Sequence, residues 1–93
     1  MSATISLQSK LDLRAAGPLR QDLLACQGSD LVLDASGVTQ IGGLALQVIR
    51  SAARSWSEAG KTLRFENAST DVCDQLSLLG FNPDTLTKWE HAT

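Results

Sequence analysis

Residues 31–60 read LVLDASGVTQIGGLALQVIRSAARSWSEAG, and this stretch decides the fold. The apolar run Leu31–Leu33 ends at an acid, Asp34, which is the pattern of a strand buried in a sheet. A loop follows, and Gly42 and Gly43 then open a long segment with helical spacing of its apolar residues. The start of a helix leaves backbone N–H groups unpaired. This segment is therefore the candidate binding site of the chain.

Outward from this stretch, strand patterns alternate with helix patterns along the whole chain. Strands are predicted at Ile5–Leu7, Asp30–Asp34 and Thr62–Glu66, with a possible partner strand or extended turn at Leu11–Leu13 and a short strand around Leu86–Trp89. Helices are predicted at Ala15–Gln27, with Pro18 in its first turn, at Gly43–Ala59, and from the N-cap Ser69 to Gly80. Ala45, Ile49, Ala52 and Trp56 are expected on the buried face of the second helix. Val72, Leu76 and Leu79 are expected to line the third, with Phe81 folding back on them.

This order predicts one α/β domain over residues 1–93. We expect a mostly parallel central sheet of four to five strands, with three to four helices and right-handed crossovers. Because Leu31–Leu33 has three consecutive apolar residues, we expect that strand to be central and buried on both faces.

Composition excludes several classes of partner. A net charge of −2 and a pI near 5.1, with scattered basic residues, argue against nucleic acid and against an anionic membrane surface. The start of the chain is not a signal peptide, and no apolar run is long enough to span a bilayer. Cys26 and Cys73 lie in unrelated segments and are expected to be reduced thiols. We therefore expect a cytoplasmic protein, a monomer or weak dimer, without membrane insertion.

The residues needed for catalysis are missing. The single histidine, His91, lies close to the end of the chain, where a solvated tail is expected. No Ser-His-Asp or Cys-His set can be built without it, and the acids do not cluster as metal ligands. We predict no catalytic residues, no cofactor and no metal site.

Three features of the candidate site each have a structural and a functional interpretation. Asp34 can bond to the N–H groups of its own loop or face a ligand at the strand edge. Gly42 and Gly43 can permit a tight turn or let an anion approach, although no phosphate-binding loop motif is present. Arg50 and Arg54, with Gln47 before them, can be a solvated helix face or a partner contact.

The stretch LVLDASGVTQIGGLALQVI resembles the signature of STAS domains. This family includes bacterial anti-sigma factor antagonists, cytoplasmic domains of sulfate transporters and small subunits of phospholipid-transport systems. The resemblance runs from about Leu11 to Phe81 and includes the Gly60-Lys61 turn and the LLGF that ends the third helix. The GGLALQV segment also resembles a subgroup found beside chemotaxis genes.

The resemblance fails at the position that matters most for regulation. Without gaps, the family's Asp falls on Gly42 and its phosphorylated Ser or Thr falls on Gly43. Glycine has no hydroxyl, so the family's phosphate switch cannot act at Gly43. Ser36 and Thr39 carry hydroxyls in the same loop but do not match the family's site; regulation there is an alternative.

These observations predict a non-catalytic interaction module in bacterial signalling, similar to an anti-sigma factor antagonist but without its phosphorylation site. The partner would be a protein: an anti-sigma factor or kinase, a chemotaxis component or a transporter subunit. It would dock on the loop Ala35–Gly43 and the start of the second helix. The predicted contact residues are Asp34, Ser36, Thr39, Gly42, Gly43, Gln47, Arg50 and Arg54. One alternative function is that of a chemotaxis-cluster adaptor or a phospholipid-transport subunit. An alternative of another functional class is nucleotide or anion binding at the Asp34/Gly42 edge.

Overall fold

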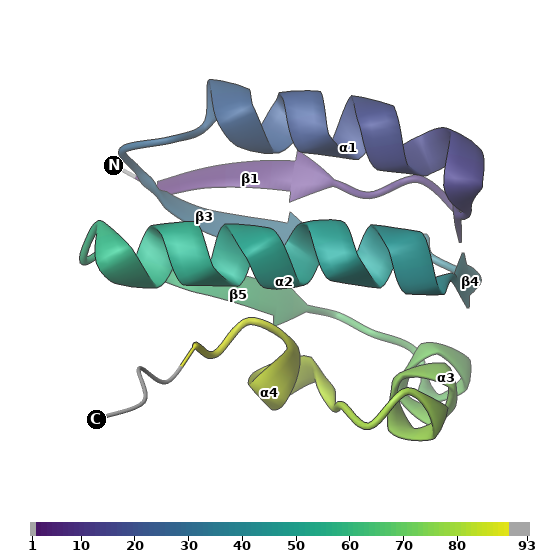
Figure 1. Cartoon of the computed structure of the whole chain (residues 1–93). Coiled ribbons are helices and arrows are strands. Elements are labelled where there is room, and N and C mark those ends of the chain that lie inside the picture. The colour runs from purple at the N-terminus through teal and green to yellow at the C-terminus, as the bar shows by residue number, and fades with distance from the viewer. Residues whose placement is uncertain (1, 90–93) are drawn as a thin grey trace.

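A computed structural model describes residues 2–89 of the 93-residue chain. Its strands are β1 (Ser2–Ser6), β2 (Lys10–Leu11), β3 (Asp30–Asp34), β4 (Gln40–Ile41) and β5 (Leu63–Glu66). Its helices are α1 (Leu13–Ala25), α2 (Gly43–Glu58), α3 (Thr70–Leu78) and α4 (Pro83–Leu86) (Figure 1). The predicted α/β class is confirmed.

Two parallel sheets form the strand layer. The main sheet has the order β1-β3-β5, and its register aligns Ile5 with Leu33 and Leu33 with Phe65. The second sheet pairs β2 with β4 and continues the chain toward the starts of α1 and α2. The five strands of the described residues are thus divided between two sheets instead of forming one. β3 is the central strand of the main sheet, as predicted.

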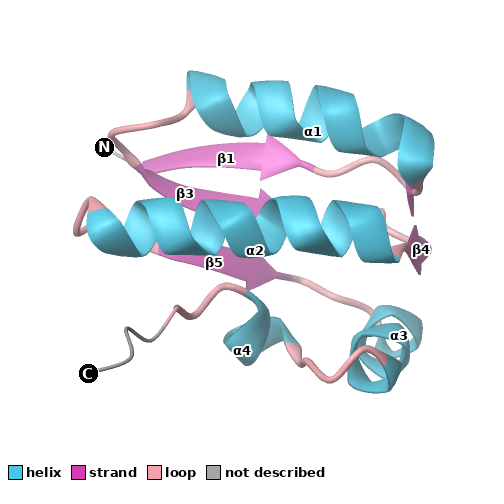
Figure 2. Ribbon diagram, viewed as in Figure 1, coloured by secondary structure: helices cyan, strands magenta, loops and turns pink. Residues whose placement is uncertain are grey.

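Both long helices cover the same face of the main sheet (Figure 2). The strands follow one another across the sheet in chain order, so two right-handed crossovers place α1 and α2 on one side. Leu31 and Leu33 point to the helices and are buried, whereas Val32 between them is only half-buried. The expectation that β3 is covered on both faces is therefore wrong. Arg64 and Glu66 are exposed, and Arg64 lies beside Val32 in the register.

The core lies between the sheet and the helices, and α2 contributes the largest share of its helical residues. Ala45, Ile49, Ala52 and Trp56 are buried on the sheet-facing side of α2, as their spacing predicts. The Trp56 indole Nε1 donates a hydrogen bond to the backbone oxygen of Ser29 at 2.8 Å, so the polar atom of this buried ring is satisfied.

Helix α1 begins earlier than the sequence pattern predicts. The Asp12 side chain accepts hydrogen bonds from the N–H groups of Arg14 and Ala15, so the helix starts at Leu13. Leu13 consequently lies in the first turn and is 75% exposed, not in an extended segment. Pro18 lies inside the helix, not in its first turn, and the expectation for it is wrong.

Helix α3 has the predicted ends. Ser69 caps it by accepting the N–H of Val72 at 3.2 Å. After the left-handed Gly80, the N–H of Phe81 returns to the oxygen of Leu76 at 2.8 Å, which folds the chain back on the helix. Leu79, expected in the buried stripe, is 43% exposed.

The prediction of a short strand around Leu86–Trp89 is wrong, because α4 ends at Leu86 and residues 87–89 form a turn and irregular chain. Pro83 follows the N-cap Asn82, and Asn82 and Thr85 form a capping box. Leu86 is completely buried and anchors this last helix to the core. His91 lies outside the described residues. Among residues 2–89, no helix has the length and apolar character needed to cross a bilayer.

Candidate partner-docking site

Asp34 ends β3, and its carboxylate accepts hydrogen bonds from neighbouring residues. The Oδ1 atom accepts the backbone N–H of Ser36 at 3.0 Å and the side-chain Nδ2 of Asn67 at 3.1 Å. The Ser36 backbone hydrogen bond, followed by the bond from Asn67, holds the pKa of Asp34 below its usual range because both stabilise the charged form. Asp34 thus bonds to its own loop and ties it to the segment after β5. A ligand role at this edge stays a prediction.

The loop after Asp34 is held against the segment that precedes α1. The backbone oxygen of Ser9 accepts the Thr39 N–H at 2.7 Å, the Thr39 hydroxyl at 3.0 Å and the Gln40 N–H at 3.2 Å. The β2–β4 ladder continues this contact. Ser36 and Thr39 are both exposed, and a regulatory role for either stays a prediction.

A glutamine of α3 holds the other side of the loop. Gln75 donates through Nε2 to the oxygen of Thr39 at 3.0 Å and accepts the N–H of Ile41 through Oε1 at 2.9 Å. The Gln75 amide therefore pairs with backbone groups of residues 39 and 41, as a neighbouring strand would. The sequence analysis missed Gln75; the available signal is a polar residue between Val72 and Leu76, on the buried side of the helix.

Two glycines connect this loop to α2, and their surroundings differ. Gly42 is the N-cap; its N–H donates to the oxygen of Leu11 at 2.8 Å, and a Cβ atom there would lie 3.4 Å from that oxygen. Gly43 is exposed, and a Cβ atom there would meet nothing within 4 Å. Gly42 therefore serves close packing on β2, whereas Gly43 leaves the first turn of α2 bare to solvent.

Two exposed leucines lie in the first turns of adjoining helices. Leu13 is the first residue of α1 and Leu44 is the second residue of α2, and the two helix starts adjoin because a Cβ atom at Gly42 would lie 4.0 Å from the Cα atom of Asp12. Their side chains are 75% and 44% exposed. Leu78, the last residue of α3, and its C-cap Leu79 are also exposed. Exposed apolar residues at adjoining helix starts beside a fixed loop are typical of an interaction surface.

Farther along α2, Arg50 is engaged by the protein itself. This half-buried side chain donates through Nη1 to carbonyl oxygens at the end of α4. The acceptors are Thr85 at 3.0 Å, Leu86 at 2.9 Å and Lys88. Its guanidinium also lies 5.0 Å from the centroid of the Phe81 ring and 5.1 Å from that of Trp89. Arg50 thus holds residues 83–89, here named the C-terminal segment, against α2.

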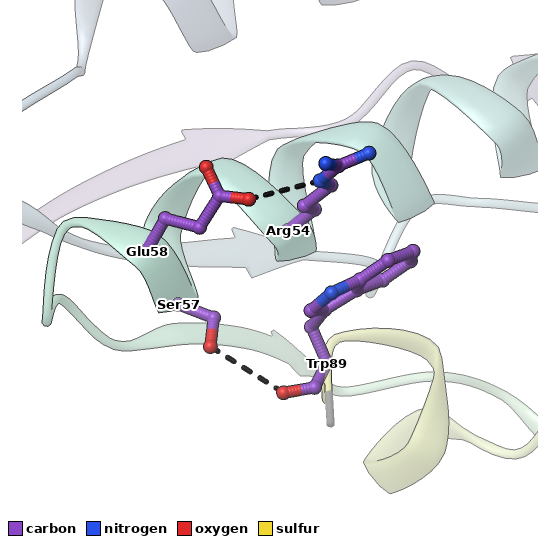
Figure 3. Close-up of polar contacts among 4 residues, drawn as sticks. All are labelled: Arg54, Ser57, Glu58 and Trp89. Atoms are coloured by element: carbon purple, nitrogen blue, oxygen red, sulfur yellow. Dashed lines mark hydrogen bonds and ion pairs between the residues drawn. The ribbon is translucent and has the colours of Figure 1, made fainter. Parts of the chain in front are cut away.

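Arg54 lies one turn later and remains exposed. Its Nε donates to Oε1 of Glu58 at 2.9 Å, and its guanidinium lies 5.8 Å from the Trp89 ring (Figure 3). Ser57 donates through its hydroxyl to the backbone oxygen of Trp89 at 3.4 Å, as Figure 3 also shows. The end of α2 therefore also contacts the C-terminal segment.

The structure separates the predicted contact residues into two sets. The strand edge brings together Asp34, Ser36, Thr39, Gly42 and Gly43, with exposed Gln47 one turn into α2. Arg50 and Arg54 face the C-terminal segment instead. Partner contact by any of these residues stays a prediction.

Reactive groups do not gather at this edge. Within residues 2–89, no group of three or more His, Cys, Asp or Glu side chains is placed to hold a metal ion. Cys26 and Cys73 are both free and half-buried.

The chain belongs to the STAS domain family. A family model described as "Mlab, STAS domain" matches residues 1–88. STAS domains are known for protein-interaction roles and are generally non-catalytic. No curated protein matches the sequence.

The fold is shared with part of a solved transporter. The structure of the murine Solute Carrier 26 family member A9 anion transporter in the inward-facing state matches with a TM-score of 0.73 and 18% identity. The match covers 90% of this chain but only 15% of the transporter chain. At this identity the likeness shows the fold alone, and anion transport belongs to that protein.

Proposed function

We propose that this STAS domain is a constitutive adaptor in bacterial signalling, located in the cytoplasm. It resembles an anti-sigma factor antagonist, but its docking is not controlled by phosphate at Gly43. The partner protein docks on the loop Ala35–Gly43 and the first turns of α2. The pathway is that of an anti-sigma factor or kinase, of chemotaxis or of lipid transport.

The exposed leucines at the two adjoining helix starts are the observation that carries this proposal. Leu13 in the first turn of α1 and Leu44 next to Gly43 expose apolar surface, although a domain of this size needs most of its apolar side chains for its core. Burying these side chains against a partner would remove apolar area from water, which is the main driving force of association.

The fixed backbone of the loop supports the same proposal. Three different segments hold it by hydrogen bonds. The loop donates to Ser9 and to Gln75, and Asn67 donates to Asp34 at the start of the loop. A loop held in this way loses little conformational freedom on binding, so less of the interaction energy is spent on ordering. Because Gly43 has no side chain, a partner backbone can approach the helix start closely.

Anion or nucleotide binding at the same edge has less support. The loop 35–43 contains no basic residue, and the charged carboxylate of Asp34 lies at its start. A negative ligand would meet a negative edge, with only the helix start to attract it.

The test compares two exposed glycines. In affinity purification from the organism that encodes the protein, a tagged Gly43→Glu variant should lose the partner, because a long charged side chain then blocks the helix start. Gly17→Glu is the matched control: Gly17 is exposed in α1, and a Cβ atom there also meets nothing within 4 Å. That variant should retain the partner.

Circular dichroism must show that both variants are folded. If Gly43→Glu recovers the partner as efficiently as the wild-type protein, docking does not use this edge and the proposal is wrong.

A further inference from the structure

The outer edge of β5 is a second candidate interaction surface, because backbone N–H and C=O groups point outward there. Among residues 2–89, β5 is the last strand in the sheet order β1-β3-β5 and pairs with β3 alone. Leu31 donates its N–H to the oxygen of Thr62 at 2.9 Å, and Ala35 donates to the oxygen of Glu66 at 2.8 Å. In a parallel ladder alternate residues face the same neighbour. The N–H and C=O groups of Leu63 and Phe65 therefore point away from β3, to the open edge.

A groove of about 480 Å³ runs along this open edge. Its walls are β5 on one side and α4 with Trp89 on the other, and α2 contributes Ala53 and Trp56. Leu63 and Phe65 are themselves almost fully buried, at 7% and 5% exposed. Backbone groups of buried residues need hydrogen-bond partners. Only another extended backbone offers donors and acceptors with the matching alternation.

The charges around the groove differ between its two ends. Figure 1 shows the yellow part of the chain after α4 running back along β5, toward the end at which β5 begins. Lys61 comes two residues before β5, and Lys88 precedes Trp89, whose backbone oxygen accepts the Ser57 hydroxyl near the end of α2, so both lysines line the groove near the start of β5. Glu66 is the last residue of β5 and pairs with Arg64 at 3.7 Å on the exposed sheet face, and Asp84 lines the groove from α4. The excess positive charge of the groove therefore lies near the start of β5.

We propose that this groove binds an extended segment of a partner protein, which adds to the sheet as a strand antiparallel to β5. In this direction the carboxyl end of the segment lies beside Lys61 and Lys88, so acidic residues there complement the lysines. The four residues of β5 offer pairing over roughly 13 Å, given about 3.3 Å per residue. This surface is separate from the docking loop and does not depend on the function proposed for it.

A second copy of the chain fits this edge less well. Each copy carries its own α4 and Trp89 beside β5, so two β5 edges brought together would also bring these segments into the same space. β5 is short and carries the charges of Arg64 and Glu66, which is how natural edge strands avoid pairing with their own kind.

The test uses a designed peptide and NMR spectroscopy of the whole protein. The probe is acetyl-Lys-Thr-Val-Thr-Val-Glu-Glu-amide, whose blocked ends leave only side-chain charges. Titrated to millimolar concentration, it should slow hydrogen exchange of the Leu63 and Phe65 amides and leave Arg64 unchanged, since the Arg64 amide already faces β3. The same peptide with both valine nitrogens methylated cannot donate these bonds to β5 and should not protect either amide.

Charge variants test the direction of the added strand. Lys61→Glu with Lys88→Glu should weaken probe binding roughly five-fold, since two exposed ion pairs are lost. Lys10→Glu is the matched control, an exposed lysine on β2, and should bind as the wild-type protein does.

Several results would overturn the proposal. One is no protection of Leu63 and Phe65 at millimolar probe. Another is protection of Thr4 and Ser6 instead, which are the outward-facing residues of β1 at the opposite edge. A third is a dimer in light scattering whose Leu63 and Phe65 amides are already protected without peptide, which would make a second copy the occupant.

Discussion

The first turns of α2 and the turns from Arg50 onward lie on one helix, yet they have different surroundings. Gly43 and Gln47 are exposed at the carboxyl edge of the sheet. Arg50 is half-buried under the C-terminal segment, and Arg54 reaches toward Trp89. The sequence pattern treats all four as one polar ridge, and the structure divides it into an open half and a covered half.

The difference shows how one polar face can serve two purposes. A guanidinium has several N–H donors and a flat surface, so Arg50 can satisfy the carbonyl oxygens at the end of α4 and stack near two rings at once. Gly43 offers none of this and leaves the helix start free. The covered half holds the domain together, and the open half remains available for a partner.

The largest expected effect comes from breaking the covered half. Arg50→Ala should lower the free energy of unfolding by about 2–3 kcal/mol, because carbonyl oxygens of α4 lose a charged donor and the Phe81 and Trp89 rings lose the Arg50 guanidinium beside them. Urea unfolding followed by circular dichroism measures this. Gln47→Ala is the control in the open half and should change stability by less than about 0.5 kcal/mol. Equal effects of the two substitutions would remove the distinction between the halves.

A smaller effect is expected where the docking loop is held. Gln75→Ala should cost about 1–2 kcal/mol, because the Ile41 N–H and the Thr39 oxygen each lose a partner. Amide exchange at Ile41 should accelerate more than global unfolding explains. Ser77→Ala, at an exposed position of the same helix, is the control. Unchanged exchange at Ile41 would show that the loop keeps its shape without Gln75.

The smallest expected effect is a dependence of stability on pH, caused by Asp34 beside the open half. Because hydrogen bonds lower the pKa of Asp34 in the folded protein, its contribution to stability is complete above the unfolded pKa of about 4 and is lost as the pH falls through the lower folded value. Asp34→Asn should therefore be less stable than wild type at neutral pH and approach it in acid. Unfolding curves at several pH values check this; a constant difference between the two proteins would contradict it.

Much of the open half was predictable because its interactions are local. Asp34 at the end of an apolar run indicated the strand edge, and Gly42 and Gly43 indicated the start of α2, where the structure places it. Gln75 was not found, because its partners Thr39 and Ile41 are more than thirty residues away in the chain. Only the docking of α3 on β4 brings them together.

The covered half was not predictable in the same way. The expectation of a strand around Leu86–Trp89 overlooked the helix start at Asn82, where Asn82 and Thr85 form a capping box. Arg50 was predicted to be either a solvated residue or a partner contact, since nothing near it in sequence reveals that α4 will lie over it. Leu13 was expected in a strand or extended turn and Leu79 in the buried stripe of the third helix, and both are exposed.

The sequence by itself determined the class of the domain, its central strand, its long helix and the absence of a hydroxyl at position 43. These follow from periodicity, caps and residue chemistry, which act over a few residues. The tertiary structure alone decided that the main sheet has one bare face, that β5 keeps an open edge beside a charged groove, and that half of a polar ridge is covered. Those features depend on which distant segments pack together, and packing joins residues that no local pattern relates.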